Sequence, residues 1–173
     1  MATQGQFVGD TVLGIIAEDV GLGQIVYMGA NPADPFYDKG IWYVAYADRQ
    51  QGGTDFWYGQ NQLGIALQAA TATPVTSTQS GTEIQILLKG YYSPGPRGFG
   101  GYAGSVQEGR PMYLDAQITA TSSMFYPNKG VANDAIPTNR TTSAVVRVIG
   151  YGYMNSGDDV IRFEPDKTWI EYP

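Results

Sequence analysis

The chain has 173 residues and contains neither cysteine nor histidine. These two absences exclude disulfide bonds, thiolate and imidazole metal sites, and catalysis that depends on a cysteine nucleophile or a Ser-His-Asp triad. Charged residues make up only 15% of the chain, against about 25% in an average soluble domain, and the net charge is −6. Because an acidic chain repels phosphate groups and anionic lipid, neither nucleic acid nor a membrane is an expected partner.

The length of the chain fits one domain. Residues 1–22 are expected to form an N-terminal arm or an edge strand, and residues 23–173 a single β domain. No run approaches the roughly 18 apolar residues of a membrane helix, and the first residues lack the basic and apolar regions of a signal peptide. We therefore expect the protein to be made in the cytoplasm.

Segments typical of β-strands occur throughout the chain, bounded by clusters of glycine, proline, asparagine and serine. The sequence predicts strands at Thr11–Ile16, Gln24–Met28, Ile41–Ala47, Leu63–Ala69, Glu83–Tyr92, Pro111–Leu114, Ser143–Tyr153, Val160–Glu164 and Thr168–Tyr172. Only two short windows, Leu63–Thr71 and Ala132–Ile136, have any helical pattern. The prediction is an all-β fold, a β-barrel or a β-sandwich, with long loops rich in glycine, proline and tyrosine.

Two short patterns recur along the chain. Gly23–Met28 is similar to Gly109–Leu114, and Leu63–Leu67 is similar to Ile149–Tyr153, each at an offset of 86 residues (109 − 23 and 150 − 64). In each set a glycine turn precedes one strand and a glycine interrupts a later strand, where it permits a bulge or a close backbone approach. The patterns indicate an internal pseudo-repeat with halves at residues 23–92 and 109–173.

Long segments without a strand pattern separate these strands, and loops of more than about 12–15 residues are uncommon unless they bind something. Residues 91–102 hold four aromatic side chains among glycine and proline, which fits either a surface loop or a contact arm. Candidate partner contacts come from the N-terminal arm, this segment and the last strand: Phe7, Val8, Tyr91, Tyr92, Arg97, Phe99, Tyr102, Trp169 and Tyr172. We assign Tyr27, Trp42 and Tyr113 to the core or to a seam between subunits.

Carboxylates are the main remaining candidates for catalysis, because a pair of them can cleave a glycosidic bond. Acidic residues gather near the C-terminus at Asp158, Asp159, Glu164 and Asp166, but no calcium-binding loop pattern is present, and the favoured interpretation of residues 155–159 is a turn between two strands. Aromatic pairs such as Trp57 and Tyr58 could stack on sugars, although such residues more often belong to a core or an interface. We predict no catalytic residue, no cofactor and no metal site.

Several segments resemble a known group of proteins. Val145–Tyr153 and Val160–Glu171 are similar to the ending "VRVVGYA…IYFNPDNTWVE" of small structural proteins of tailed bacteriophages, including those of marine cyanophages. Three segments further upstream resemble that group's "LGIAL", "VLLRGFV" and "GxPLYLS" motifs in the same order: Leu63–Leu67, Ile86–Tyr91 and Gly109–Leu114. The resemblance covers roughly residues 23–171, with long insertions at residues 91–109 and 114–142.

The resemblance implies a non-enzymatic structural protein of the virion. It favours a capsid decoration or cement protein that binds the major capsid protein on the outer shell as a small homo-oligomer, with a trimer favoured. One alternative is a component of the tail, baseplate or fibre. An alternative from a different class is a carbohydrate-binding module or a glycan hydrolase that uses Trp57, Tyr58 and a carboxylate pair.

Overall fold

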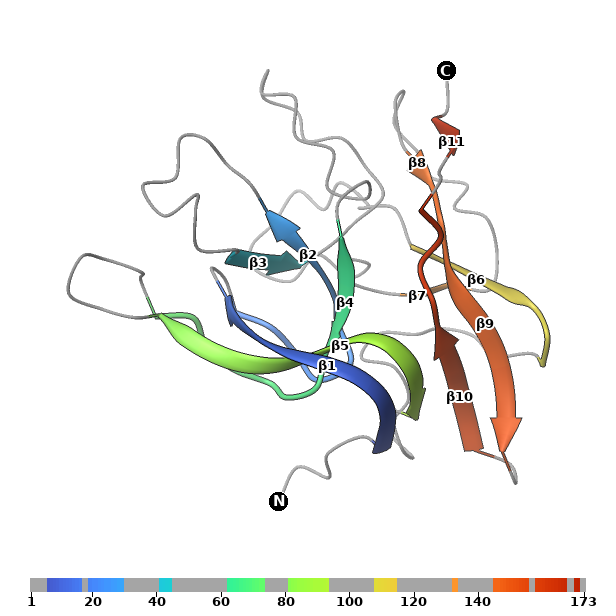
Figure 1. Cartoon of the computed structure of the whole chain (residues 1–173), viewed down its shortest axis with the longest axis horizontal. Helices are drawn as coiled ribbons and strands as arrows, with labels where there is room; N and C mark the ends of the chain where they lie inside the picture. The colour runs from blue at the N-terminus through green and yellow to red at the C-terminus, as the bar shows by residue number, and fades with distance from the viewer. Residues whose placement is uncertain are drawn as a thin grey trace, which may run out of the picture.

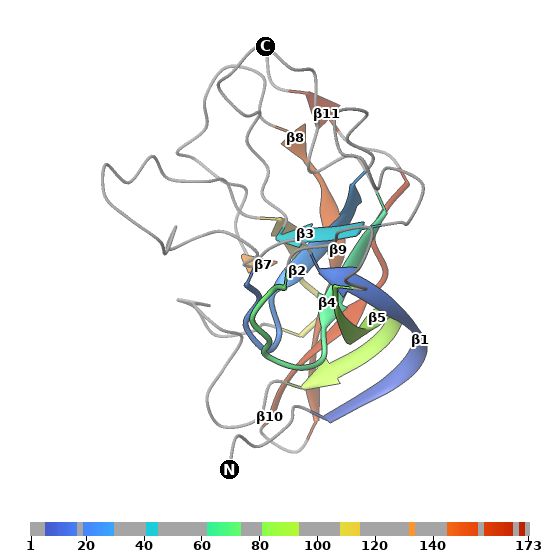
Figure 2. The same cartoon turned by 90° about the vertical axis from the view of Figure 1, so that its left-hand side faces the viewer.

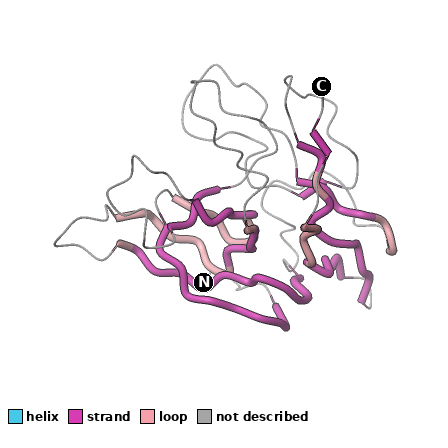
Figure 3. The backbone as a smooth tube through the Cα atoms, turned by 45° about the horizontal axis from the view of Figure 1, so that its top comes forward, coloured by secondary structure: helices cyan, strands magenta, loops and turns pink. Residues whose placement is uncertain are grey.

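The computed structural model describes residues 6–16, 19–29, 41–44, 62–73, 81–93, 108–114, 132–133, 145–155, 158–167 and 170–171. This part of the chain consists of strands and their connections, without a helix (Figures 1 and 3). The strands are β1 (Gln6–Ile16), β2 (Ile25–Gly29), β3 (Ile41–Val44), β4 (Leu63–Ala66), β5 (Thr82–Ser93), β6 (Pro111–Leu114), β7 (Ala132–Asn133), β8 (Val145–Val146), β9 (Val148–Asn155), β10 (Asp158–Phe163) and β11 (Ile170–Glu171). The predicted all-β fold is confirmed.

Three details differ from the sequence prediction. Strand β1 begins at Gln6 rather than Thr11, because its whole length pairs with β5. The predicted strand Ser143–Tyr153 is divided at Arg147 into β8 and β9. Strand β7 was not predicted: it begins the second of the two windows with a weak helical pattern, as β4 begins the first, because pairing with neighbouring strands outweighs a marginal helical pattern.

Nine of the strands form one mixed sheet in the order β1-β3-β2-β4-β5-β10-β9-β6-β7. An additional pairing between β1 and β5 closes β1, β3, β2, β4 and β5 into a ring. The pairing of β1 with β3 is parallel, and all the other pairings are antiparallel. The described strands thus combine a closed ring with a sheet that extends from it through β10, β9, β6 and β7.

Strand β5 belongs to both parts of this arrangement. Its residues Ile86 and Leu87 pair with β4 in the ring, and its residues Gly90–Tyr92 pair with β10 in the extension. Along its other edge β5 pairs with β1, and the two run side by side as long curved ribbons (Figures 1 and 2). The register of this pair shifts between Asp10 and Thr11, which is a β-bulge that adds local twist.

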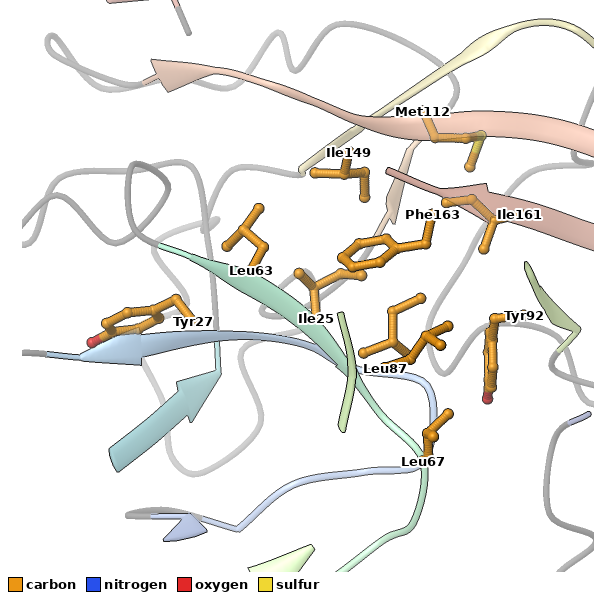
Figure 4. Packing of buried hydrophobic residues seen from close by; sticks show 11 residues of the cluster. Ile25, Tyr27, Leu63, Leu67, Leu87, Tyr92, Met112, Ile149, Ile161 and Phe163 are labelled. Atoms are coloured by element: carbon orange, nitrogen blue, oxygen red, sulfur yellow. The ribbon is translucent and has the colours of Figure 1, made fainter. Parts of the chain in front are cut away.

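Two clusters of buried side chains explain why the ring strands are apolar on both faces. One cluster draws residues from all five ring strands: Ile16, Val26, Trp42, Ala66, Ile84 and Ile86, together with Val20. The other lies between the ring and the extension and joins Ile25, Tyr27, Leu63, Ile65, Leu67, Leu87 and Tyr92 to Met112, Ile149, Ile161 and Phe163 (Figure 4). Because successive strand residues face opposite sides, β2, β4 and β5 contribute to both clusters.

The recurring sequence patterns occupy matching positions in the sheet. In the β2–β4 pair Val26 lies opposite Gly64, and in the β6–β9 pair Met112 lies opposite Gly150. The flanking backbone hydrogen bonds match as well: the Gly23 amide donates to the Ala66 carbonyl at 2.8 Å, as Gly109 does to Gly152 at 2.9 Å.

Both turn glycines, Gly23 and Gly109, have positive φ, at 81° and 75°, where other residues are strained. The similarity extends to the next strand, because Ile65 lies opposite Leu87 as Tyr151 lies opposite Arg162. The two segments of the chain therefore build the same three-strand arrangement, once in the ring and once in the extension, in the same register up to Met112, where a β-bulge shifts the β6–β9 pair.

Candidate interaction surface

Exposed tyrosine and arginine side chains gather on the outer face of β5, β10 and β9. Arg162 lies opposite Tyr91 on one side and opposite Tyr151 on the other. Residues directly opposite each other in antiparallel strands point to the same face, and Tyr153 shares it because it follows Tyr151 by two positions. We call Tyr91, Tyr151, Tyr153 and Arg162 the tyrosine face.

The rings of this face are half open to solvent. Tyr91, Tyr151 and Tyr153 are 43%, 43% and 44% exposed. The rings of Tyr91 and Tyr153 meet edge to face, with centroids 5.8 Å apart and planes at 67°. Such a contact holds the rings in place while their outer surfaces stay free, and a phenol offers both an apolar ring and a hydroxyl to a partner.

Charged groups of both signs border the tyrosine face. The Glu164 carboxylate accepts hydrogen bonds from Lys89 and, at 2.8 Å, from Arg162. The hydrogen bond from Lys89, assisted by the charges of Lys89 and Arg162, holds the pKa of Glu164 below its usual value. Asp10 lies opposite Lys89 in the β1–β5 register. The positive charges of Lys89 and Arg162 and the negative charges of Asp10 and Glu164 therefore cancel within this region.

Strand β1 presents a second exposed surface, along its edge. Among the described residues its second edge pairs only at Ile15 and Ile16, which contact β3. The remaining stretch, residues 6–14, has a single charged residue, Asp10, and exposes Val8 and Leu13 at 74% and 69%. Edge strands are usually protected by lysine, proline or short length. We call residues 6–14 the β1 edge.

The structure brings two of the predicted contact segments together, because Phe7 lies opposite Tyr92 and Val8 opposite Tyr91. Val8 and Tyr91 are exposed, whereas Phe7 packs against the cluster between ring and extension. Tyr92 is 1% exposed and is a core residue rather than a surface contact, since its side chain points to the inner face. The other predicted contacts lie outside the described residues: Arg97, Phe99, Tyr102, Trp169 and Tyr172.

The remaining aromatic residues of the sequence analysis fall into two groups. Tyr27 and Trp42 are buried in the two clusters, and Tyr113 is partly buried on β6. Trp57 and Tyr58 lie outside the described residues. Sequence reasoning missed Tyr151, Tyr153 and Arg162; the alternation Tyr151-Gly152-Tyr153 places both rings on one face, but does not show whether that face is covered.

A buried phenol makes the fold sensitive to alkaline pH. Burial raises the pKa of Tyr92 from 10.0 to about 12. The folded state holds the Tyr92 proton more tightly than the unfolded state. The protonated phenol therefore contributes fully to the free energy of unfolding below about pH 10, and this contribution is lost as the pH rises towards 12. We expect the free energy of unfolding to fall by about 2–3 kcal/mol over this range.

Urea unfolding curves at pH values from 8 to about 11.5 test this expectation. Tyr92→Phe is expected to flatten the alkaline decline, whereas Tyr91→Phe, at the exposed neighbouring position, keeps it. An unchanged pH profile in the Tyr92→Phe variant contradicts the assignment.

Two of the four acidic residues near the C-terminus, Asp158 and Asp159, take part in strand pairing. Asp158 lies opposite Asn155 and Asp159 opposite Met154, so three of the residues predicted as a turn belong to β9 and β10, and Ser156 and Gly157 lie outside the described residues. Within the described ranges, no group of three or more acidic side chains is placed to hold a metal ion. The same ranges contain no helix long and apolar enough to cross a membrane.

Comparison with protein-family models finds no match to this chain. Neither the curated proteins nor the solved structures contain a significant match.

Proposed function

We propose that this protein is a non-enzymatic structural component of a bacteriophage particle, and that it binds the outside of the assembled capsid as a decoration or cement protein. The resemblance of the β4, β5, β6 and β9–β10 segments to phage structural proteins suggests the setting. The observation that carries the proposal is the exposed, apolar and nearly uncharged β1 edge.

The β1 edge is suited to bind a β-rich shell. An added strand would pair with the N–H and C=O groups of residues 6–14 that have no strand partner among the described residues, and such main-chain pairing is a common mode of recognition. Val8 and Leu13 are five positions apart and therefore lie on opposite faces of the strand. A strand added at this edge can contact an exposed apolar side chain on each face. A protein bound across the junction of two capsid subunits stabilises the shell by mass action.

The test uses particles that lack this protein. Purified chain is incubated with empty heads, and we measure its cosedimentation and the melting temperature of the shell. We expect the chain to bind saturably at hundreds of copies per head and to raise the melting temperature of the shell. Failure to bind heads, or binding to tails in a handful of copies, overturns it.

A double variant locates the contact. Val8→Asp together with Leu13→Asp places charge on the β1 edge without touching the core, and charged edges resist strand addition. We expect at least a tenfold loss of affinity for heads, about 1.4 kcal/mol. Tyr151→Ala, on the tyrosine face, is the matched control and keeps wild-type affinity. Equal losses in the two variants argue against the β1 edge.

A further inference from the structure

The tyrosine face has a buried counterpart within the same chain. The opposed pair Tyr151 and Arg162 in β9–β10 occupies the positions that Ile65 and Leu87 occupy in β4–β5. Ile65 and Leu87 have no exposed surface, whereas Tyr151 is 43% exposed and the Arg162 side chain 54%. The same face of the same strand arrangement is thus present twice, once buried and once exposed.

The contact that buries the first of these faces is visible in the core. The opposite side of the extension lies on it and contributes Met112, Ile161 and Phe163 to the shared cluster (Figure 4). The backbone arrangement of this face therefore accepts a second β-sheet packed flat against it. Sheets that pack in this way lie about 10 Å apart, with their side chains interdigitated.

The residues that differ between the two faces indicate the kind of contact. At the matching positions the buried face carries the aliphatic residues Ile65 and Leu87, as in a permanent core, but the exposed face carries Tyr151 and Arg162. Tyrosine and arginine are enriched at the centres of interfaces between separately folded proteins, because they tolerate water when the partner is absent. The composition therefore fits a contact made after folding.

Charge favours a second copy of the chain as the occupant. Two copies with a net charge of −6 repel each other over most of their surfaces. At the tyrosine face Lys89 and Arg162 balance Asp10 and Glu164, so two copies can meet there without that repulsion. In a two-fold contact the same surface is used by both partners. Such a contact can therefore place Arg162 of each copy beside Glu164 of the other.

We propose that two copies of this chain associate through their tyrosine faces around a two-fold axis. The face spans β5, β10 and β9, about 10 Å across the strands and two residues, about 7 Å, along them. This is the size of the central cluster of an interface rather than of a whole standard one, so a dissociation constant in the micromolar range, about −8 kcal/mol, is expected. The trimer favoured from the sequence would need a different contact.

Charge exchange between copies tests the proposal by sedimentation velocity at about 10–200 μM. Wild-type chain is expected to form dimers, and the single variants Arg162→Glu and Glu164→Arg to be monomers, since each sets like charges against each other across the axis. An equimolar mixture of the two variants is expected to form dimers again, because each glutamate then meets an arginine. Leu13→Asp alone is the control and stays dimeric, because Leu13 lies on the face of β1 opposite to that of Val8 and Tyr91.

The mixture distinguishes a contact between two copies from the loss of an interaction within one copy. Both single variants lose the internal pair between Arg162 and Glu164, and mixing does not restore that pair. Melting temperatures establish that both variants are folded. A wild type that is monomeric at 200 μM, single variants that remain associated, or a mixture that stays monomeric each overturns the proposal. The proposal is also overturned if the monomer binds a glycan or another protein through Tyr151. None of these outcomes depends on whether the chain binds capsids.

Discussion

Phe163→Ala is expected to lower the free energy of unfolding by about 3–5 kcal/mol, the usual cost of removing a fully buried aromatic ring. Phe163 has no exposed surface and lies in the middle of the cluster that joins the ring to the extension (Figure 4). Natural domains are stable by only about 5–15 kcal/mol, so a loss of this size removes much of the total.

Urea unfolding followed by tryptophan fluorescence measures the change, in a background where Trp57 and Trp169 are replaced by phenylalanine so that the signal comes from Trp42, which is buried in the other cluster. If the ring and the extension unfold together, Trp42 reports the destabilisation although it does not share a cluster with Phe163. The matched control is Val8→Ala, at a residue that is 74% exposed, with an expected change below about 0.5 kcal/mol. A loss under 1 kcal/mol in the Phe163→Ala variant contradicts this view of the core.

Gly90→Ala is expected to be the second severe change, through the backbone rather than through lost burial. Gly90 lies opposite Gly9 in the β1–β5 pair, and its φ of 145° is one that other residues rarely adopt. A methyl group at this position would overlap the Val8 carbonyl oxygen and lie 2.7 Å from the Gly9 Cα. The dihedral strain costs about 1–3 kcal/mol, and displacement of β1 adds to it.

Gly109→Ala provides the control for Gly90→Ala. Gly109 also has positive φ, but a methyl group there has no heavy atom within 4 Å. Its cost is therefore the dihedral strain alone, about 1–2 kcal/mol. The difference between the two variants in thermal or urea unfolding measures the clash between β1 and β5. Equal losses of stability in the two variants contradict the predicted clash between β1 and β5.

The two proposed contacts use different features of neighbouring surfaces, since Val8 of the β1 edge lies opposite Tyr91 of the tyrosine face. Within the part of the chain that the structure describes, the β1 edge offers unpaired backbone and exposed aliphatic side chains, which suit strand addition. The tyrosine face offers rings and balanced charges on the surface of strands that are paired along both edges. Tyr151→Ala is the control for capsid binding and Leu13→Asp is the control for self-association, so the two are measured independently.

Much of the fold could be predicted from local pattern. Clusters of turn residues and short apolar runs indicated most of the strands, and the spacing of Gly23 and Gly109 indicated the repeated arrangement. The extent of β1 could not be predicted this way. Its first half, Gln6–Asp10, carries little apolar pattern and becomes a strand because β5 is long enough to pair with it.

The exposed sites were harder to predict than the fold. Tyr91 and Tyr92 are adjacent and of the same residue type, yet one is exposed and the other is buried, since successive residues of a strand face opposite sides. The sequence contains the alternation, but not which side is covered. That choice depends on β10, whose residue Ile161 lies opposite Tyr92 from a position far along the chain.

By itself, the sequence determined the class of fold, the positions of most strands and the low charge of the surface, because these follow from local propensity and composition. Only the tertiary structure decided that β5 serves both the ring and the extension, that Ile65 and Leu87 are buried, and that their counterparts Tyr151 and Arg162 are exposed. The physical reason is that burial depends on which distant strand packs on a given face, and contacts between distant segments leave no local periodicity in the chain.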